Sequence, residues 1–513
     1  MRLQPSTSIP FEGIPQIIYK KCADSLCEPL SILFNISLMS LEVPLAWKEA
    51  IVTAIPKNSD ATHISCFRPI SITPTPVKIL ERIIREKLIS HITKFNLIPP
   101  EQHGFVSGAS TTTQLVDCVF EWSSALNSGQ MTDIIYFDLS KAFDKVNHLK
   151  LLSKLKQLGV NDTLINWIRS YLCGRRMCVK VGNSFSKSYP CHSGVPQGGV
   201  LSPLLFLLYT HDLPAKLCTH PLVKVQIYAD DIKVFACYNS QNYSEIHDAL
   251  SLSIKNMSLW AELYDIPLNL SKTLVFHVGK GDPMPYIVSG TILKNCNEIK
   301  DLGIHFNSKL SFDTHIRHVI NRSFAALFTI FRNIRSNDSL LLIKLYKCYV
   351  LPLLEYASQV WSPSTVKHQR AIERVQQTFT KLLLYRSSPN SYHHHRIPAY
   401  HDRLKKFKLD SLLQRRTFND LVFCFKVLRM NCKLRASKYW VFRPCNGRSG
   451  TFILHYKKIN SRFNSKIFST LFMRGARWLR QLPNDVLCSP STSIFKTRLR
   501  KLNFLRLLGI KEI

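Results

Sequence analysis

Residues 225–235, VQIYADDIKVF, constrain the fold of this chain more than any other stretch. Two apolar runs rich in β-branched residues flank Ala229, Asp230 and Asp231, a pattern typical of a strand, a tight turn and a second strand. Adjacent carboxylates at a hairpin tip repel each other, so the turn is either fully solvated or placed against a cation. Mg²⁺ is the natural candidate, because it takes oxygen ligands and is often held by one or two carboxylates together with substrate phosphates.

The charge of the chain points to a polyanionic partner. Its 513 residues are enough for roughly three domains. Hydrophobic residues make up 45% of them, so a large core is available. The 68 Lys and Arg residues outnumber the 34 Asp and Glu residues and leave a net charge of +34. Nucleic acid is the first partner that such an excess indicates, and an anionic membrane surface is the second.

Cysteine usage and the N-terminus indicate the compartment. The 15 cysteines are scattered and form no paired C-x₂-C sites, which argues against a structural zinc module and against a disulfide framework. The N-terminal stretch lacks the apolar core of a signal peptide. No apolar run reaches the roughly 18 residues of a membrane span. We expect a soluble intracellular protein of the cytoplasm and nucleus, neither secreted nor bound to a membrane.

A second acidic position lies at the end of a predicted strand. Residues 133–138, DIIYFD, read as a buried strand in which alternation places Ile134, Tyr136 and Asp138 on one face. An acid at the end of an apolar strand is unfavourable unless it is paired or bound to a metal. Phe143 follows five residues later, where a role in the core is the default interpretation.

Three loops carry weaker signals. Residues 194–199, GVPQGG, contain glycines that permit close approach to a ligand, and the apolar helix predicted after them should be buried under a sheet. Residues 102–105, QHGF, begin a loop that either passes close to a backbone or base pair or serves only as a connector. Pro69 favours an extended Arg68, so that Arg68 and Lys57 either face a phosphate or are ordinary surface cations.

The remaining pattern is mixed helix and strand. Residues 76–95 form an amphipathic helix in which Ile79, Ile83, Leu88 and Ile92 are predicted to pack inward. Thr111 to Thr113 are candidate N-caps of the next helix. The other expected elements are helices at 14–46, 112–126 and 244–264, two helices within 147–172 separated at Gly159, a hairpin at 173–192, a strand that starts beside Lys272, an all-helical stretch at 312–386, and a mostly helical basic stretch at 399–513 with a loop-rich middle at about 440–470.

Three acidic positions and a glycine-rich loop thus follow one another in a fixed order. If the strands are neighbours in one antiparallel sheet, Asp138, Asp230 and Asp231 converge at its surface. Converging carboxylates can hold two Mg²⁺ ions about 3.5–4 Å apart, the arrangement used for in-line phosphoryl and nucleotidyl transfer. The basic scaffold would then hold the polyanionic substrate.

The chain resembles the reverse transcriptase of a non-LTR (LINE-type) retrotransposon, most similar to the jockey and CR1 groups. The resemblance covers about residues 10–386 and extends to the tail RWLRQLPNDVLCSPSTSIFKTRLRKL. The segments that carry it are WKEAIVTAIPK, FRPISITPTPVKILERII, QHGFVSGASTTTQL, YFDLSKAFDKVNH, GVPQGGVLSPLLFLLY, YADD, LNLSKT and DLGI.

The resemblance implies an α+β fold in the form of a right hand, with fingers, a palm of antiparallel sheet backed by helices, and a helical thumb. The implied domains are an N-terminal helical extension at 1–50, fingers and palm at 51–309, the thumb at 310–386, and a basic C-terminal region without an assigned role at 387–513.

The resemblance also implies the roles of single residues. Asp138, Asp230 and Asp231 match the catalytic metal ligands, with Asp231 the less direct of the adjacent pair, and Lys272 matches a general acid that protonates the departing pyrophosphate. The implied substrate-binding residues are Lys57 and Arg68 at the triphosphate, Phe143 beneath the deoxyribose, and Gly194, Gln197 and Gly198 along the template and nascent base pair. Gly199 stands where relatives often carry Ser.

The implied function is RNA-directed DNA synthesis with two Mg²⁺ ions, for which Mn²⁺ would substitute, using template RNA, primer DNA and dNTPs. The upstream endonuclease domain of the relatives is not recognisable in this sequence, so target nicking would need an endonuclease supplied elsewhere. One alternative is a catalytically silent, truncated or domesticated nucleic-acid-binding relic. Another is a group II intron-type reverse transcriptase, which also uses YADD, although the helical stretch after residue 310 and the C-terminal tail argue against it.

Overall fold

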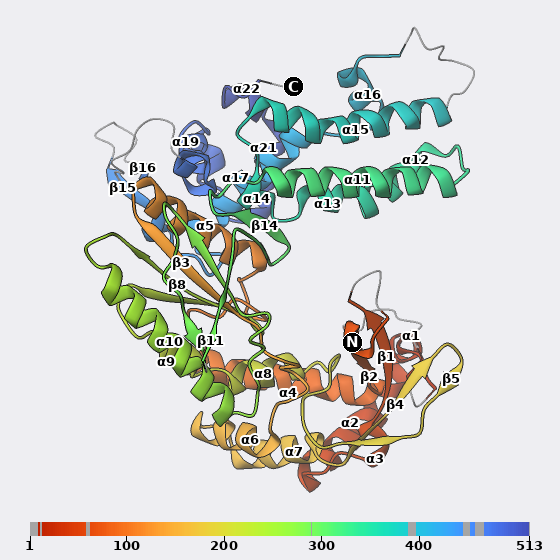
Figure 1. Ribbon diagram of the computed structural model, residues 1–513. Coiled ribbons are helices and arrows are strands. Elements are labelled where there is room, and N and C mark those ends of the chain that lie inside the picture. The colour runs from red at the N-terminus through yellow and green to blue at the C-terminus, as the bar shows by residue number, and fades with distance from the viewer. Residues whose placement is uncertain are drawn as a thin grey trace.

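The computed structural model describes residues 9–10, 13–57, 62–288, 290–387, 397–444, 452–456 and 466–511. These residues form a curved arrangement of sheets and helices (Figure 1). A sheet near the N-terminus lies at one end, a second sheet lies in the middle, and a helical region lies at the other end, next to the C-terminal helices (Figure 1). None of the described helices is both long and apolar enough to cross a membrane.

The N-terminal sheet has the strand order β2-β1-β4-β5, with β6 paired to β4. Its strands are β1 Glu49–Pro56, β2 Phe67–Ile72, β4 Arg175–Val181, β5 Ser184–Phe185 and β6 Tyr189–Cys191. Strand β1 is antiparallel to β2 and parallel to β4. The hairpin predicted at 173–192 is confirmed, and its turn lies at Gly182 with Val181 paired to Ser184.

The central sheet has the order β12-β9-β3-β8-β7. Its strands are β3 Met131–Phe137, β7 Val223–Tyr228, β8 Asp231–Tyr238, β9 Leu274–Val278 and β12 Lys294–Cys296. Strand β3 lies in the middle and is antiparallel to both β8 and β9, as predicted. Only the edge strand β12 departs from the antiparallel pattern, because it runs parallel to β9.

Helices cover both faces of the central sheet, because the strands alternate their apolar side chains. Ile135 and Phe137 enter one core together with helix α8, whereas Ile134 and Phe235 enter another with Trp122. The covering helices are α5 Thr111–Asn127, α6 His148–Gln157, α7 Asp162–Leu172, α8 Ser202–Tyr209, α9 Leu213–Leu217 and α10 Tyr243–Leu263. Helix α8 is apolar nearly all round and is buried along almost its whole length, as its sequence predicts.

The helical region follows a small hairpin of β13 Glu298–Asp301 and β14 Ile304–Asn307. Its main elements are α11 Asp313–Asn333, α12 Ser339–Leu345, a π-helical turn Tyr346–Val350, α13 Leu351–Glu355, α14 Ser358–Trp361 and α15 Val366–Ser387. The all-helical prediction for this stretch is confirmed. The break predicted at Ser387 to His395 lies largely outside the described residues.

The C-terminal region contains α16 Tyr400–Phe407, α17 Leu412–Leu428, α18 Ala436–Tyr439, α19 Leu471–Leu479, α20 Asn484–Leu487, α21 Thr492–Lys501 and α22 Phe504–Leu507. Within the loop-rich middle expected at 440–470, the described residues contain a hairpin that the sequence did not reveal, in which β15 Trp440–Pro444 is antiparallel to β16 Phe452–Tyr456. The rest of that prediction falls largely on residues 445–451 and 457–465, which lie outside the described residues.

Three local predictions need correction. Helix α4 spans Thr75–Lys94 as expected, but Ile83 is 45% exposed, and Ile84 is buried in its place. The N-cap of α5 is Ser110, whose hydroxyl accepts from the Thr113 N–H while the Thr113 hydroxyl accepts from the Ser110 N–H, forming a capping box. The stretch 14–46 is divided among three helices, listed as α1 Gln16–Lys21, α2 Ala23–Ser40 and α3 Leu45–Lys48.

Candidate active site

The three predicted acidic residues lie at one edge of the central sheet. Asp138 follows β3 directly, and Asp231 is the first residue of β8. Phe137 pairs with Ile232 as the last pair of the β3–β8 ladder, and Asp138 and Asp231 are the adjoining residues at that end. Asp230 lies in the two-residue turn between β7 and β8. The hairpin and the neighbouring strand therefore bring together side chains that lie 92 and 93 positions apart in the sequence.

The turn of residues 228–231, called the acid turn below, is supported from outside the sheet. Ala229 adopts a left-handed φ of 60°, as the tight turns of hairpins require. The Ala229 N–H donates to Gln102 Oε1 at 3.1 Å, and the Gly104 N–H donates to the same oxygen at 2.7 Å. A Cβ at Gly104 would lie 2.3 Å from the Ala229 nitrogen. Residues 102–105 thus approach a backbone, and it is that of the acid turn.

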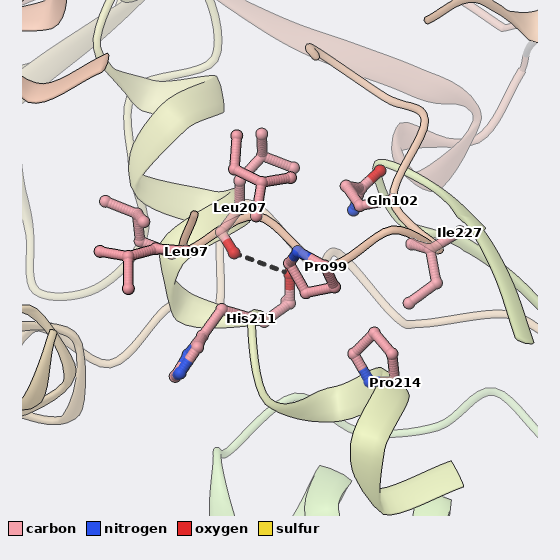
Figure 2. Close-up of a pocket in the computed structure, with 10 residues that line it drawn as sticks. Leu97, Pro99, Gln102, Leu207, His211, Pro214 and Ile227 are labelled. Carbon is pink, nitrogen blue, oxygen red and sulfur yellow. Dashed lines mark hydrogen bonds between the residues drawn. The ribbon is translucent and has the colours of Figure 1, made fainter. Parts of the chain in front are cut away.

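Figure 2 shows the space behind this turn, where the loop carrying Pro99 and Gln102 passes Ile227. The cavity there is about 10 Å³, enough for a single water molecule. Its walls are mostly apolar and include Leu207 of α8 and Pro214 of α9. The loop is therefore packed between the hairpin and these helices, which limits its freedom.

The acidic cluster carries uncompensated negative charge. Burial raises the pKa of Asp231 to about 6, and the charge of Asp230 adds to this effect. Asp301 and Asp138 act in the same direction on the pKa of Asp231, while Lys233 opposes them. The pKa of Asp230 is also raised, by burial first and by Asp138 as well. Because their pKa values are raised, Asp230 and Asp231 bind protons more readily than free carboxylates do. A cation bound beside them at neutral pH would displace those protons.

A cavity of about 510 Å³ opens beside Asp138 and Asp231. Lys272 lines it, with its Nζ 3.8 Å from Asp138 Oδ2. The far wall is formed by residues 298–303 of the β13–β14 hairpin. The cavity is large enough for part of a nucleotide, and it has both signs of charge on its walls.

A buried ion pair lies beneath the cavity, and sequence reasoning missed it. Lys233 Nζ contacts Asp301 Oδ2, with the two side chains only 3% and 4% exposed. The Tyr136 hydroxyl donates to the same Asp301 oxygen at 3.0 Å. A buried lysine requires such a partner, so Lys233 on a strand beside two acids was a signal for one.

The glycines of the 194–199 loop are required by close backbone contacts. Gly194 has a φ of +85°, and a Cβ there would lie 2.7 Å from the Asp144 carbonyl oxygen. Gly198 has a φ of +119°, and a Cβ there would lie 2.5 Å from the Ser71 carbonyl oxygen. The Ser71 N–H donates to the Gln197 carbonyl at 2.6 Å. This loop therefore joins the N-terminal sheet to the region that follows β3.

Side-chain contacts hold residues 143 and 144 beside the 194–199 loop and helix α8. The Gln197 amide donates to Asp144 Oδ1 at 2.8 Å, a contact that sequence reasoning did not predict. Phe143 stacks on Phe206 with ring centres 4.4 Å apart, and Phe105 meets its edge at 6.3 Å. Phe143 is half-buried, so one side of the ring is held by the core and the rest remains accessible.

Glu81 of α4 is a further residue that the sequence did not reveal. Its carboxylate is fully buried and accepts from the Leu201 N–H at 2.8 Å, at the start of α8. A carboxylate there is favourable because the N-terminus of a helix leaves N–H groups unsatisfied. A Cβ at the neighbouring Gly199 would lie 2.6 Å from Ser202 Oγ, so the glycine fits a crowded site.

Arg68 lies on β2, and Lys57 directly follows the paired strand β1, at one end of the N-terminal sheet. The Lys57 N–H donates to the Cys66 carbonyl at 2.8 Å, and Arg68 pairs with Ile55. Both side chains are exposed. Burial raises the pKa values of Asp230 and Asp144. The charge of Arg68 acts in the opposite direction on Asp230, and the charge of Lys57 does so on Asp144. The charge of Arg68 therefore reaches the candidate site at Asp230, whereas that of Lys57 reaches Asp144, the partner of Gln197.

The donor set suits a hard divalent cation. Asp138, Asp230 and Asp231 offer only carboxylate oxygens, the ligands that Mg²⁺ prefers. Within the part of the chain that the structure describes, no three His, Cys, Asp or Glu side chains are close enough to form a complete metal site by themselves. A bound substrate phosphate commonly completes such a site.

Comparison with known proteins agrees with this geometry. Residues 55–306 match the family described as reverse transcriptase (RNA-dependent DNA polymerase). The chain contains a reverse transcriptase domain. All three acidic residues, the 194–199 loop, Arg68 and Lys272 lie inside the matched range.

The curated relatives of this reverse transcriptase domain are proteins of mobile elements. The chain is 28% identical to the probable RNA-directed DNA polymerase from transposon X-element of Drosophila melanogaster, over 69% of the chain and 39% of that protein. It is 30% identical to the RNA-directed DNA polymerase from mobile element jockey of Drosophila funebris, over 68% of the chain and 39% of that protein. The chain thus spans about two fifths of the length of these relatives.

Among solved structures, apo telomerase from Candida tropicalis matches with a TM-score of 0.40 and 13% identity, over 72% of this chain and 61% of that one. The α+β fold class is confirmed, because the described residues combine sheets with separate groups of helices, whereas the right-hand arrangement stays a prediction. The central sheet carries the acidic residues, between the N-terminal sheet and the helical region (Figure 1).

Proposed function

We propose that this chain is an RNA-directed DNA polymerase that adds a dNTP to the 3′-OH of a DNA primer on an RNA template. The observation that carries the proposal is the meeting of Asp138 with the acid turn at one edge of the central sheet, within a reverse transcriptase domain. Hydrolysis of target DNA is a separate reaction, for which we propose an endonuclease partner. An RNA template and a DNA product imply action in the cytoplasm and nucleus.

We assign Asp138, Asp230 and Asp231 as the residues that would hold two Mg²⁺ ions, with Mn²⁺ as a substitute. When bound, such ions lower the pKa of the attacking hydroxyl and neutralise charge on the leaving pyrophosphate. The pKa values of Asp230 and Asp231 are raised by burial first and by neighbouring carboxylates as well, and a cation bound beside these like charges would relieve their repulsion, which supports the assignment.

The other roles follow from what each side chain offers. Lys57 and Arg68 would bind the triphosphate, since both are exposed cations and the charge of Arg68 reaches Asp230. Lys272 would donate a proton to the departing pyrophosphate, and the distance of 3.8 Å between its Nζ and Oδ2 of the proposed metal ligand Asp138 supports this role. Phe143, held by Phe206, would support the deoxyribose and exclude a 2′-hydroxyl.

The template and the nascent base pair would lie along Gly194, Gln197 and Gly198. Gly198 is exposed there, and the lack of a side chain at either glycine permits the close backbone contacts with Asp144 and Ser71 that hold the loop. In domain terms, we assign residues 51–309 to fingers and palm, 310–386 to the thumb, and 1–50 to an N-terminal extension. The part from 387 to 513 is the C-terminal region.

A primer-extension assay tests the proposal. Purified protein with poly(A), oligo(dT), dTTP and Mg²⁺ should incorporate nucleotide, and Asp230→Asn should reduce kcat by more than about 100-fold. The expected loss exceeds the 10–100-fold typical of residues that only orient metal ligands. Affinity for the primer–template duplex should be unchanged or higher, because the substitution removes negative charge.

Asp248→Asn is the matched control, since Asp248 is an exposed aspartate on α10, and this variant should keep full activity. A wild-type protein that binds the duplex but incorporates no nucleotide would overturn the proposal and favour the silent nucleic-acid-binding relic.

A further inference from the structure

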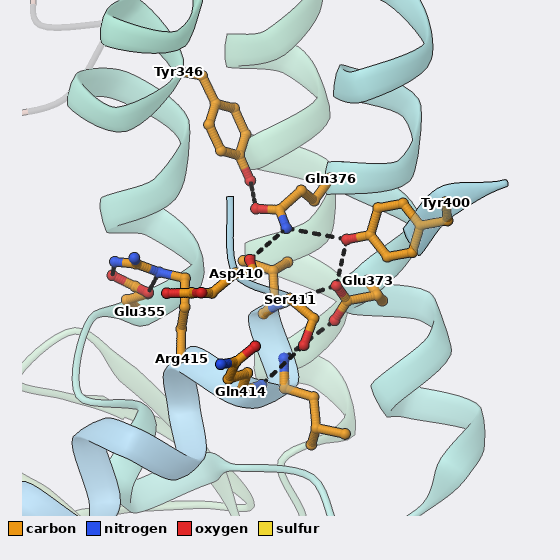
Figure 3. Close-up of polar contacts among 11 residues, drawn as sticks. Tyr346, Glu355, Glu373, Gln376, Tyr400, Asp410, Ser411, Gln414 and Arg415 are labelled. Carbon is orange, nitrogen blue, oxygen red and sulfur yellow. Dashed lines mark hydrogen bonds and ion pairs between the residues drawn. The ribbon is translucent and has the colours of Figure 1, made fainter. Parts of the chain in front are cut away.

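The C-terminal region is joined to the helical region by a buried polar network (Figure 3). Glu373 of α15 is 1% exposed, and its carboxylate accepts from the backbone N–H groups of Leu412 at 2.9 Å and Leu413 at 3.2 Å, which open helix α17. The Tyr400 hydroxyl donates to the same carboxylate at 2.5 Å, and the Gln376 amide donates to Tyr400 at 3.0 Å. Because separation would leave Glu373 buried without partners, α15, α16 and α17 should behave as one body.

Residues 430–440, called the strap below, extend from the end of α17 to helix α5. Lys438 Nζ lies 2.5 Å from Asp117 Oδ1 and 2.9 Å from Glu121 Oε1. The Tyr439 hydroxyl donates to the same Asp117 oxygen at 2.6 Å, and its ring stacks on Phe472. The strap is therefore fixed to the helix that covers the central sheet.

Lys433 lies in the middle of the strap and contacts the loop before α5. Its Nζ donates to the carbonyl oxygens of Gln102 and, at 3.2 Å, Pro99, and its backbone N–H donates to the Gly108 carbonyl at 2.9 Å. It forms no ion pair with any carboxylate of the described residues. Burial lowers the pKa of the Lys433 ammonium to about 8. A half-buried lysine that donates only to carbonyls stabilises one particular path of the loop.

That loop is the support of the acid turn. Gln102 Oε1 accepts from the Ala229 N–H, the His103 N–H donates to the Ile227 carbonyl at 2.7 Å, and the Ile227 N–H donates to the Glu101 carbonyl at 3.0 Å. A continuous set of hydrogen bonds thus runs from Lys433 through Gln102 to the turn that carries Asp230.

We propose that Lys433 is a positioning residue for nucleotide transfer, which it serves by fixing the loop that holds the acid turn. The inference rests on the proposed polymerase function and assigns a role to the C-terminal region. Lys433 touches neither substrate nor metal ligand. It acts through Gln102, so its loss should affect the chemical step more than binding.

The test compares Lys433→Met, which keeps the aliphatic stem, with Lys433→Arg, which keeps donors and charge. In primer extension, Lys433→Met should lower kcat by about 10–100-fold, the usual cost of losing a residue that orients a site, while KM for dTTP and duplex affinity stay within about twofold. Lys433→Arg should recover most of the activity. Lys405→Met, at an exposed lysine of α16, controls for the loss of one positive charge and should behave as wild type.

A second readout does not depend on activity. Amide hydrogen exchange of peptides covering 99–104 and 224–233 should be faster in Lys433→Met than in wild type or Lys405→Met. Should Lys433→Met not fold, Gln102→Met keeps the backbone carbonyl that Lys433 contacts but removes the side-chain oxygen that accepts from the Ala229 N–H, and it should show the same kcat loss.

The outcomes separate the two proposals. If hydrogen exchange at residues 99–104 and 224–233 is the same in Lys433→Met as in wild type, the positioning role is overturned. If the wild-type protein is active and Lys433→Met has the same kcat, the positioning role is overturned as well. If the wild-type protein is inactive but the acid turn still exchanges faster in Lys433→Met, only the polymerase function is overturned. Lys433 then remains the residue that fixes the turn.

Discussion

At the scale of single residues, the site depends on buried charges whose partners lie far away in the sequence. Lys233 and Asp301 are separated by 68 positions, and Glu81 contacts Leu201 across 120 positions. Each of these side chains satisfies a group that would otherwise be buried and unpaired. The acidic residues above them are thus carried on a rigid polar base.

Lys233→Met should destabilise the protein by about 3–5 kcal/mol, because it leaves Asp301 buried without its cation. The double variant Lys233→Met/Asp301→Leu should recover much of that loss, since replacing both members of a buried pair by apolar groups is often nearly neutral. Urea unfolding of the three proteins measures the effect. Equal stability of wild type and Lys233→Met would show that the pair is dispensable.

Sequence reasoning found the acidic residues and missed their supports for a physical reason. Asp138 and the acid turn are marked by short-range patterns, namely strand alternation, apolar runs and adjacent acids at a turn. The partners of Lys233, Glu81 and Lys433 depend on contacts between distant segments, and no local period encodes these contacts. The predictions for Ile83 and for the N-cap of α5 were wrong because the neighbouring residues Ile84 and Ser110 fit the same local patterns equally well.

At the scale of elements, the acid turn is a three-part structure and not an isolated hairpin. Strands β7 and β8 form it, and the loop at 102–105 adds to its edge through backbone hydrogen bonds. Gly104 permits this contact, since any side chain would overlap the Ala229 backbone. The loop and the hairpin therefore form one structural unit, although more than 120 residues separate them in the sequence.

Gly104→Ala should displace the loop and reduce kcat about tenfold, on the scale expected when a reacting group is misplaced by about 1 Å or less. Gly129→Ala is the matched control, because a Cβ there meets nothing within 4 Å and only the φ of +74° opposes it. That control should cost about 1–2 kcal/mol of stability and leave kcat unchanged. Equal kcat values for the two variants would contradict the proposed support of the turn.

At the scale of the whole molecule, charge and architecture act together. The net charge of +34 would attract a nucleic acid, and Asp138 and Asp231 line the cavity in which its reacting end would lie. The helical and C-terminal regions share one buried polar network, and the strap extends that unit to the central sheet.

Binding of a primer–template duplex should weaken steeply with salt, because each neutralised phosphate releases counterions. Between 50 and 200 mM salt we expect a loss of affinity of about 10³-fold or more, as for proteins that make roughly 6–10 phosphate contacts. Fluorescence anisotropy of a labelled duplex measures it, with Asp230→Asn as a comparison that should show a similar slope. Affinity that does not vary with salt would contradict an electrostatic mode of binding.

The contact between Lys433 and the loop at Gln102 has a consequence for synthesis of the protein itself. The two residues are 331 positions apart, and at about 5–20 residues per second a ribosome needs roughly 15–65 s to pass from one to the other. Until Lys433 has been synthesised, the loop that holds the acid turn lacks the hydrogen bonds that Lys433 donates. A nascent chain of this kind would become competent to copy RNA only after residue 433 has been synthesised and has left the ribosome.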